Sequence, residues 1–132
     1  MQHHQEELTI SAEETGLREV LVRISGELDI RTSSALLGAL GTMLADDDVL
    51  LLRLDLSDVR FCDHAGLRAL HALGEAAGPD RVRIVAAHSS VDTILRLCRI
   101  PAFLGHTPPN GDLPGPFGRP RAGVAERSRE GT

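Results

Sequence analysis

Leu50-Leu-Leu-Arg-Leu-Asp-Leu-Ser-Asp-Val-Arg-Phe-Cys-Asp-His-Ala-Gly-Leu-Arg-Ala-Leu70 is the stretch of sequence that decides the expected fold. Its first half predicts a strand, because it is apolar at the start and then alternates leucines with charged residues. Its second half predicts a helix, because Asp63 is a typical N-cap residue and leucines follow it at helical spacing. The junction between them, Phe61–Gly66, is short, and it places His64 near the positive end of the helix, exposed to a partner.

The composition is typical of one soluble globular domain. The chain has 132 residues, of which 42% are hydrophobic and 25% charged, enough for one aliphatic core. Three Phe, no Trp or Tyr and a net charge of −5 argue against nucleic-acid binding. The apolar runs are shorter than the roughly 20 residues needed to span a bilayer. The N-terminus lacks the pattern of a signal peptide, so we expect a cytoplasmic protein without membrane insertion.

The rest of the chain alternates predicted strands with predicted helices. A weak strand over residues 8–12, a turn at Thr15–Gly16 and a strand over residues 19–25 together predict a hairpin. Helices are expected to begin within residues 29–34, at the central junction and near Ser89 or Ser90, and another strand over residues 82–87. The order β-β-α-β-α-β-α predicts an α/β fold, a small mixed sheet of about four strands with helices packed against it.

The expected boundaries of this domain are residues 8 and 104. Residues 1–7 are predicted to be a flexible N-terminus. From Gly105 to Thr132, eleven of 28 residues are Gly or Pro, which predicts a disordered tail.

No motif for catalysis or metal binding is present. The sequence has no Gly-rich phosphate loop, no Cys-x-x-Cys and no His-Glu-x-x-His. His64 and His71 are placed to share a helix face, but two histidines without a third ligand make a poor metal site. Asp55, Asp58 and Asp63 are best interpreted as a strand-edge group, a turn former and a helix cap. We therefore expect no metal, no cofactor and no enzymatic activity.

Two motifs resemble the STAS domain family, which includes bacterial anti-sigma factor antagonists and the tails of sulphate transporters. They are Ile24-Ser-Gly-Glu-Leu-Asp29 and Leu54-Asp-Leu-Ser-Asp-Val-Arg-Phe-Cys-Asp-His-Ala-Gly-Leu-Arg-Ala-Leu70. Together with the order of elements, the resemblance covers residues 8 to 104 and implies the STAS fold. For an antagonist it also implies a partner. That partner is an anti-sigma factor, a serine/threonine kinase of the histidine-kinase-like ATPase fold, and its capture frees a sigma factor.

The resemblance also implies where a switch is normally found. In the antagonists, the kinase phosphorylates a Ser or Thr directly after the junction Asp, and the added negative charge breaks the complex. Asp63 and Gly66 match this pattern, but His64 stands at the phosphoacceptor position and Ala65 follows it. A serine kinase can esterify neither side chain. The resemblance thus implies an antagonist-like regulator without a phosphoacceptor at the usual position.

Other positions of the expected binding site lie at the end of the second predicted strand. Glu27 and Asp29 lie where the family docks its kinase, although Asp29 alternatively caps a helix. Ser57 is a poor substitute phosphoacceptor, because it fits the family's turn after the central strand. The alternative interpretation of His64 is a surface residue in a paralogue that has lost its partner.

The sequence is also compatible with a second class of partner. Some STAS proteins are accessory subunits that bind the ATPase of an ABC-type lipid transporter, and their junction can also read Asp-x-Ala-Gly. A nucleotide-binding or catalytic role has no motif behind it. We expect a monomer or a weak dimer.

Overall fold

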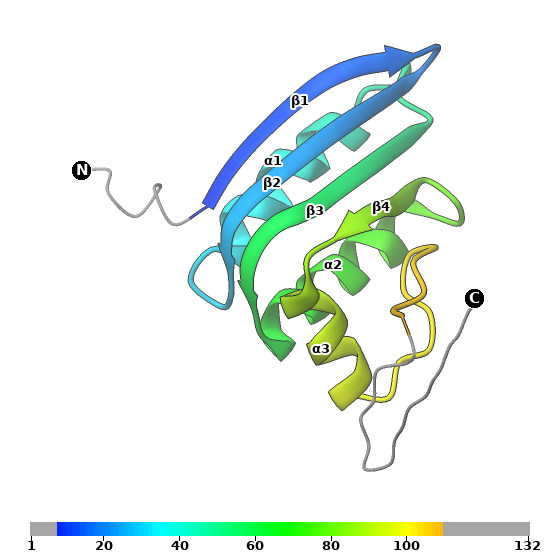
Figure 1. Cartoon of the computed structure of the whole chain (residues 1–132). Coiled ribbons are helices and arrows are strands. Elements are labelled where there is room, and N and C mark those ends of the chain that lie inside the picture. Colours follow the sequence, from blue (N-terminus) through cyan, green and yellow to red (C-terminus); the bar gives the residue numbers. More distant parts are fainter. Residues whose placement is uncertain (1–7, 110–132) are drawn as a thin grey trace.

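The computed structural model describes residues 8–109, which form an open mixed sheet with helices on both of its sides (Figure 1). The elements are β1 (Leu8–Gly16), β2 (Glu19–Leu28), α1 (Ser33–Leu44), β3 (Leu51–Cys62), α2 (His64–Ala77), β4 (Val82–Ala87) and α3 (Ser89–Leu97). The strand order is β1-β2-β3-β4, with β1 antiparallel to β2 and the other neighbours parallel. This confirms the predicted α/β fold. The predicted flexible N-terminus and the predicted disorder of residues 110–132 lie outside the described residues.

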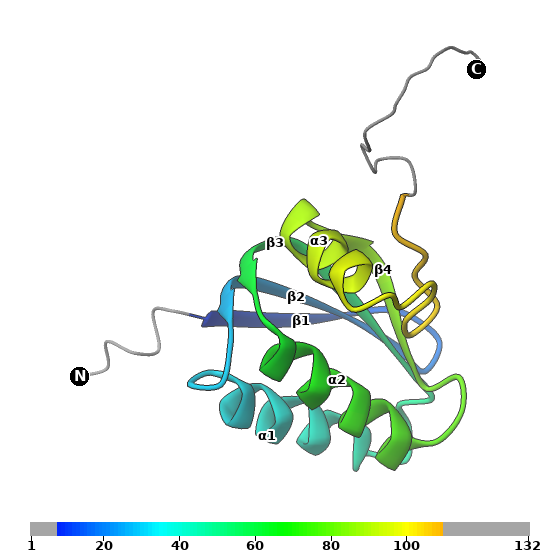
Figure 2. The ribbon, with the colours of Figure 1, turned by 90° about the horizontal axis from the view of Figure 1, so that it is seen from below.

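The helices form two unequal layers around the sheet. Helices α1 and α2 lie side by side on one face, whereas α3 lies on the other side of the sheet, next to β3 and β4 (Figure 2). On β3, Leu52, Leu54 and Leu56 are fully buried, while the alternate residues Arg53 and Asp55 are half-exposed. The alternation that predicted this strand therefore corresponds to one buried and one more polar face.

The β1–β2 hairpin turns later than the sequence predicted. The turn lies at Leu17 and Arg18, and Arg18 has a φ of 65°, in the left-handed region. Thr15 and Gly16 belong to β1, where the pairing shifts register before Gly16 meets Glu19. The predicted turn was wrong because a glycine in a strand also marks an irregularity of pairing.

The described fold also continues beyond the predicted end of the domain. The His106 Nε2 atom lies 2.7 Å from Oδ1 of Asp92, a largely buried polar contact between residues 105–109 and α3. The Arg96 guanidinium donates to the carbonyl of Pro109 at 3.2 Å. Residues 105–109 thus pack on the domain instead of starting a tail, because these contacts fix them to α3.

Arg81 joins the ends of the two helices that share one face of the sheet. Its Nη2 donates to the carbonyls of Leu44, the last residue of α1, at 3.2 Å and of Val49 at 2.8 Å. Its Nη1 donates to the carbonyl of Ala77, the last residue of α2, at 3.5 Å. A cation is favoured at both ends, because the last carbonyls of a helix carry partial negative charge.

Replacing Arg81 with Met should lower the free energy of unfolding by about 2 kcal/mol, since it leaves carbonyls at two helix ends without their charged donor. Urea denaturation measures the change. Arg83→Met is the matched control, because Arg83 lies two residues further along, exposed on β4, and we expect a change within about 0.5 kcal/mol. Equal losses in the two variants would contradict the role assigned to Arg81.

Candidate functional site

The central strand and the second helix are joined by one residue. β3 ends at Cys62 and α2 begins at His64, so Asp63 alone makes the junction. The Asp63 Oδ1 atom accepts the N–H of Gly66 at 2.9 Å, which confirms Asp63 as the cap of α2. The N–H of Asp63 donates to the carbonyl of Leu28 at 3.2 Å. The junction is therefore fixed both to its own helix and to the end of β2.

Gly66 allows the first turn of α2 to lie directly on β2. A Cβ atom at this position would be 2.7 Å from the Leu28 carbonyl oxygen and 2.7 Å from Leu28 Cγ. Contacts this short do not occur with real side chains, so any larger residue must push the helix away from the strand. Leu28 and Cys62 are paired in the parallel sheet. Pairing and close approach together bring the two sequence motifs into one site.

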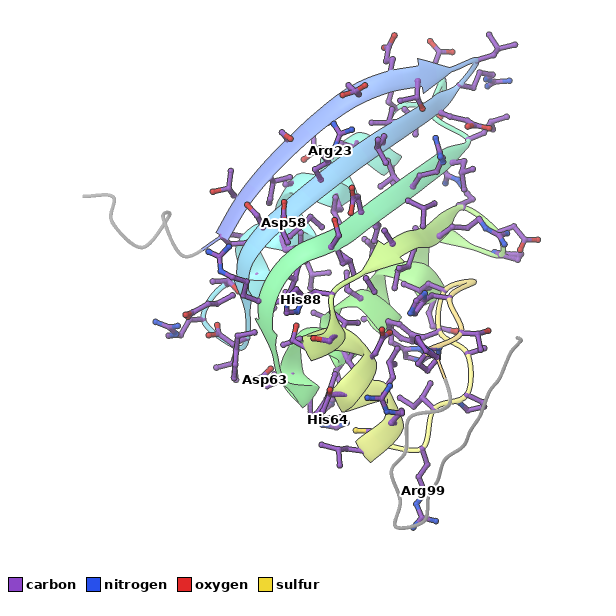
Figure 3. All side chains as sticks on the ribbon, in the orientation of Figure 1. Arg23, Asp58, Asp63, His64, His88 and Arg99 are labelled. Atoms are coloured by element: carbon purple, nitrogen blue, oxygen red, sulfur yellow. The ribbon has the colours of Figure 1, made fainter. Side chains whose placement is uncertain are left out.

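His64 is presented to the surroundings at the start of α2. Its side chain is exposed, whereas that of Ala65 is half-buried. Figure 3 shows Asp63 and His64 together where β3 gives way to α2, at the end of the sheet opposite the β1–β2 turn. An approaching protein can therefore contact the imidazole at the position that the resemblance assigns to a phosphoacceptor.

Asp29 organises the loop between β2 and α1. Its carboxylate is buried, and Oδ1 accepts the backbone N–H groups of Arg31 at 2.9 Å and of Thr32 at 3.2 Å. Its Oδ2 accepts from the Arg31 guanidinium at 2.8 Å. The cap of α1 is Thr32, so the alternative that Asp29 itself caps the helix is corrected: it holds the turn before the helix.

Glu27 differs from Asp29 in being exposed. Its Oε1 accepts from the Arg31 guanidinium at 3.1 Å. Of the two acidic residues expected in the site, Glu27 is thus accessible to a partner, whereas Asp29 is buried and supports the loop.

The hydrogen bonds of Asp29 change its acidity. Burial raises the pKa of this carboxyl, but the Arg31 side chain and the N–H groups of Thr32 and Arg31 outweigh burial and hold the pKa below the ordinary value of 3.8. A lowered pKa means that the ionised form stabilises the fold. That contribution is present above the pKa of the unfolded chain and is lost as the pH falls through the lower folded pKa.

Asp29→Asn should therefore lower the free energy of unfolding most at neutral pH. The difference from the wild-type protein should shrink as the pH falls below 3.8, where the wild-type carboxyl loses its own advantage. Urea denaturation across this range measures the effect. Asp58→Asn, at an exposed position of β3, is the control. A loss for Asp29→Asn that stays constant as the pH falls would contradict the assignment.

Ser57 and Asp58 lie inside β3, not in a turn after it. The pairing with β2 shifts register here, between Asp55 and Asp58 (Figure 3 labels Asp58 on the strand). The Asp55 Oδ1 atom accepts the Ser57 hydroxyl at 2.6 Å and the Ser57 N–H at 2.9 Å. The hydrogen bond from the Ser57 hydroxyl is the largest cause of a lowered pKa at Asp55. The Ser57 N–H and the Arg23 charge lower this pKa further, and together they outweigh burial, which raises it. The turn predicted here was wrong, because a bulge within a strand accommodates the same polar residues.

Two large apolar side chains at this end of the sheet were missed by the sequence analysis. Ile30, in the β2–α1 loop, is 75% exposed, and Phe61, near the end of β3, is 48% exposed. Phe61 pairs with Glu27 across the two strands. The available signal was an isoleucine between two charged loop residues, together with a phenylalanine outside the alternation of buried leucines.

The described residues hold no cluster of metal ligands. Within residues 8–109, no group of three or more His, Cys, Asp and Glu side chains is arranged to hold a metal ion. His64 and His71 are both exposed on α2. None of the helices described is long and apolar enough to cross a membrane.

Comparison with known proteins identifies the family. Residues 11–104 match the family model described as "Mlab, STAS domain". A search of curated proteins finds no match. The chain belongs to the STAS domain family.

Three similar solved structures are all antagonists of anti-sigma factors. The structure of an anti-sigma factor antagonist from Mycobacterium paratuberculosis is 31% identical, with a TM-score of 0.62 over 70% of this chain and 79% of that chain. SpoIIAA in its unphosphorylated form is 17% identical, with a TM-score of 0.55 over 70% and 82%. A STAS domain antagonist from Rhodobacter sphaeroides is 14% identical, with a TM-score of 0.50 over 66% and 90%. The last two share the fold with this chain.

Proposed function

We propose that this protein is an anti-sigma factor antagonist-like regulator that binds a serine-kinase-type anti-sigma factor in the cytoplasm and so releases a sigma factor. The observation that carries the proposal is the exposed His64 in the junction Asp63–Gly66, where Asp63 caps α2 and Gly66 lies directly against Leu28 of β2. The 31% identity to an anti-sigma factor antagonist supports the same role. The protein acts by binding and performs no reaction of its own.

The second part of the proposal concerns the missing phosphoacceptor. His64 and Ala65 carry no hydroxyl group, so a serine kinase cannot place a phosphate on either residue. Phosphorylation at this junction therefore does not end the complex. The protein acts as a constitutive antagonist, or it is controlled by another route.

A second candidate partner is the ATPase of an ABC-type lipid transporter. One observation favours it: the junction reads Asp63-His64-Ala65-Gly66, which fits the pattern Asp-x-Ala-Gly of such accessory subunits. This partner would bind at the same exposed junction. The two candidates use the same junction and differ in the identity of the partner.

A pull-down from the protein's own cells tests the proposal. The tagged chain is incubated with lysate in ADP or in ATP, and bound proteins are identified by mass spectrometry. His64→Glu serves as the second bait, because a negative charge beside Asp63 imitates the phosphorylated state. Capture of a kinase-type anti-sigma factor in both nucleotides by the wild-type bait alone supports the proposal. Capture of a transporter ATPase supports the second candidate, and capture of neither overturns both.

A further inference from the structure

We infer that Ile30 and Phe61 are the apolar anchors of this binding site, and that Arg60 and Arg68 attract carboxylates around them. The inference rests on the proposed function in one respect, namely that a protein partner binds at the junction. It adds the chemistry of the partner's surface, which is an apolar pocket bordered by acidic side chains.

The exposure of the two apolar side chains is built into ordered parts of the chain. Ile30 is 75% exposed, yet its loop is held by the hydrogen bonds of Asp29 to the backbone of the next residues. Phe61 is 48% exposed, yet it lies in β3, one residue before the buried Cys62. Both anchors therefore keep their positions before a partner binds, which lowers the entropy lost on association.

The two anchors belong to neighbouring strand ends. Phe61 pairs with Glu27 in the parallel sheet, and Ile30 follows Glu27 by three residues. His64 begins α2 directly after the same end of β3 (Figures 1 and 3). A partner that covers His64 thus meets apolar surface from the β2–α1 loop and from the end of β3, and such central apolar contacts usually dominate the affinity of an interface.

The charges around the junction indicate the sign of the partner. Arg60 and Arg68 are exposed, and among the described residues neither forms an ion pair or a hydrogen bond through its side chain. Arg23, by contrast, is paired with Glu13 at 2.9 Å. Arg68 follows His64 by four residues, so the two share a face of α2. The acidic side chains of the junction are engaged within the chain, Glu27 with Arg31 and Asp63 with the Gly66 N–H, so the two unpaired guanidinium groups favour a partner with carboxylates at the rim.

The other end of the sheet is predominantly acidic. Exposed acidic residues gather there around Arg18, in the β1–β2 hairpin and in the α1–β3 loop: Glu14, Asp46, Asp47 and Asp48. An acidic partner is repelled from that end and attracted to the junction. Charge therefore orients the encounter in the direction that the apolar anchors require.

The test is calorimetric titration of the full-length chain with purified kinase-type anti-sigma factor from the same cells. Phe61→Ala and Ile30→Ala should each raise the Kd about tenfold or more, and Arg68→Glu should raise it about tenfold. Leu17→Ala is the matched apolar control, because Leu17 is 90% exposed in the β1–β2 turn. Arg83→Glu is the matched charge control. Both controls should stay within about twofold of the wild-type Kd, and thermal unfolding checks that each variant is folded.

The outcomes separate this inference from the proposed function. If His64→Glu abolishes binding while Phe61→Ala and Ile30→Ala bind like Leu17→Ala, the assignment of Ile30 and Phe61 as anchors is wrong. The proposal that the partner binds at the junction is then still supported. If the wild-type chain does not bind the kinase, the proposed function is overturned. Self-association of the wild-type chain that Phe61→Ala removes, seen by ultracentrifugation, would overturn the assignment of this surface to an acidic partner.

Discussion

Gly66→Ala should destabilise the protein by about 3 kcal/mol, the upper end of the usual range for overpacking. The added Cβ would meet the Leu28 carbonyl oxygen and Cγ at 2.7 Å each. The oxygen belongs to the backbone of β2, so the clash cannot be relieved by a side-chain rotation alone. The first turn of α2 must move, and the hydrogen bond from the Gly66 N–H to Asp63 weakens with it. Urea denaturation gives the change in free energy.

Gly38→Ala is the matched control for this prediction. Gly38 lies inside α1, and a Cβ there would have no heavy atom within 4 Å. Alanine in a helix interior is favoured over glycine by about 0.5–1 kcal/mol, so this variant should be slightly more stable than the wild-type protein. If Gly66→Ala unfolds at the wild-type urea concentration, the close contact between α2 and β2 is not as described.

If the proposed kinase partner is correct, His64→Ser should give a protein that this anti-sigma kinase phosphorylates completely at the junction, where the wild-type chain offers no hydroxyl group. The change restores a hydroxyl group directly after Asp63, at the exposed start of α2. Phosphate adds nearly two negative charges beside the carboxylates of Asp63 and Glu27. The complex with the kinase should then dissociate in ATP and persist in ADP. Intact-mass spectrometry and size-exclusion chromatography measure the two effects.

His64→Ala is the control that separates the hydroxyl group from the loss of the imidazole. It should bind the kinase and remain unmodified in ATP. If His64→Ser also remains unmodified while bound to an active kinase, the junction is not a place where the kinase acts. Modification of His64→Ala would place the phosphoacceptor elsewhere in the chain.

The fold was predictable from the sequence where the signal is local. The alternation of Leu52, Leu54 and Leu56 and the cap at Asp63 defined β3 and the start of α2, and both are confirmed. The irregularity at Ser57 was not predictable in this way. It depends on how β3 is paired with β2, and the same Ser and Asp residues are suited to a turn and to a bulge.

The site was predictable in its position but not in its division of roles. Glu27 and Asp29 look equivalent in sequence, and only the path of the β2–α1 loop buries one carboxylate and exposes the other. Exposure of Ile30 likewise follows from that path. The contact between His106 and Asp92 joins residues fourteen positions apart. The segment around His106 has no helical or strand periodicity, so no local pattern predicts this contact.

The most direct test of the central claim is the Kd of the wild-type chain for the purified kinase-type anti-sigma factor that we propose as its partner, measured before and after incubation with ATP. We expect the same Kd at both times and a chain mass without added phosphate, because His64 and Ala65 offer no hydroxyl group to the kinase. A mass increase of one phosphate at residues 63–66, with a weaker complex, would contradict the account.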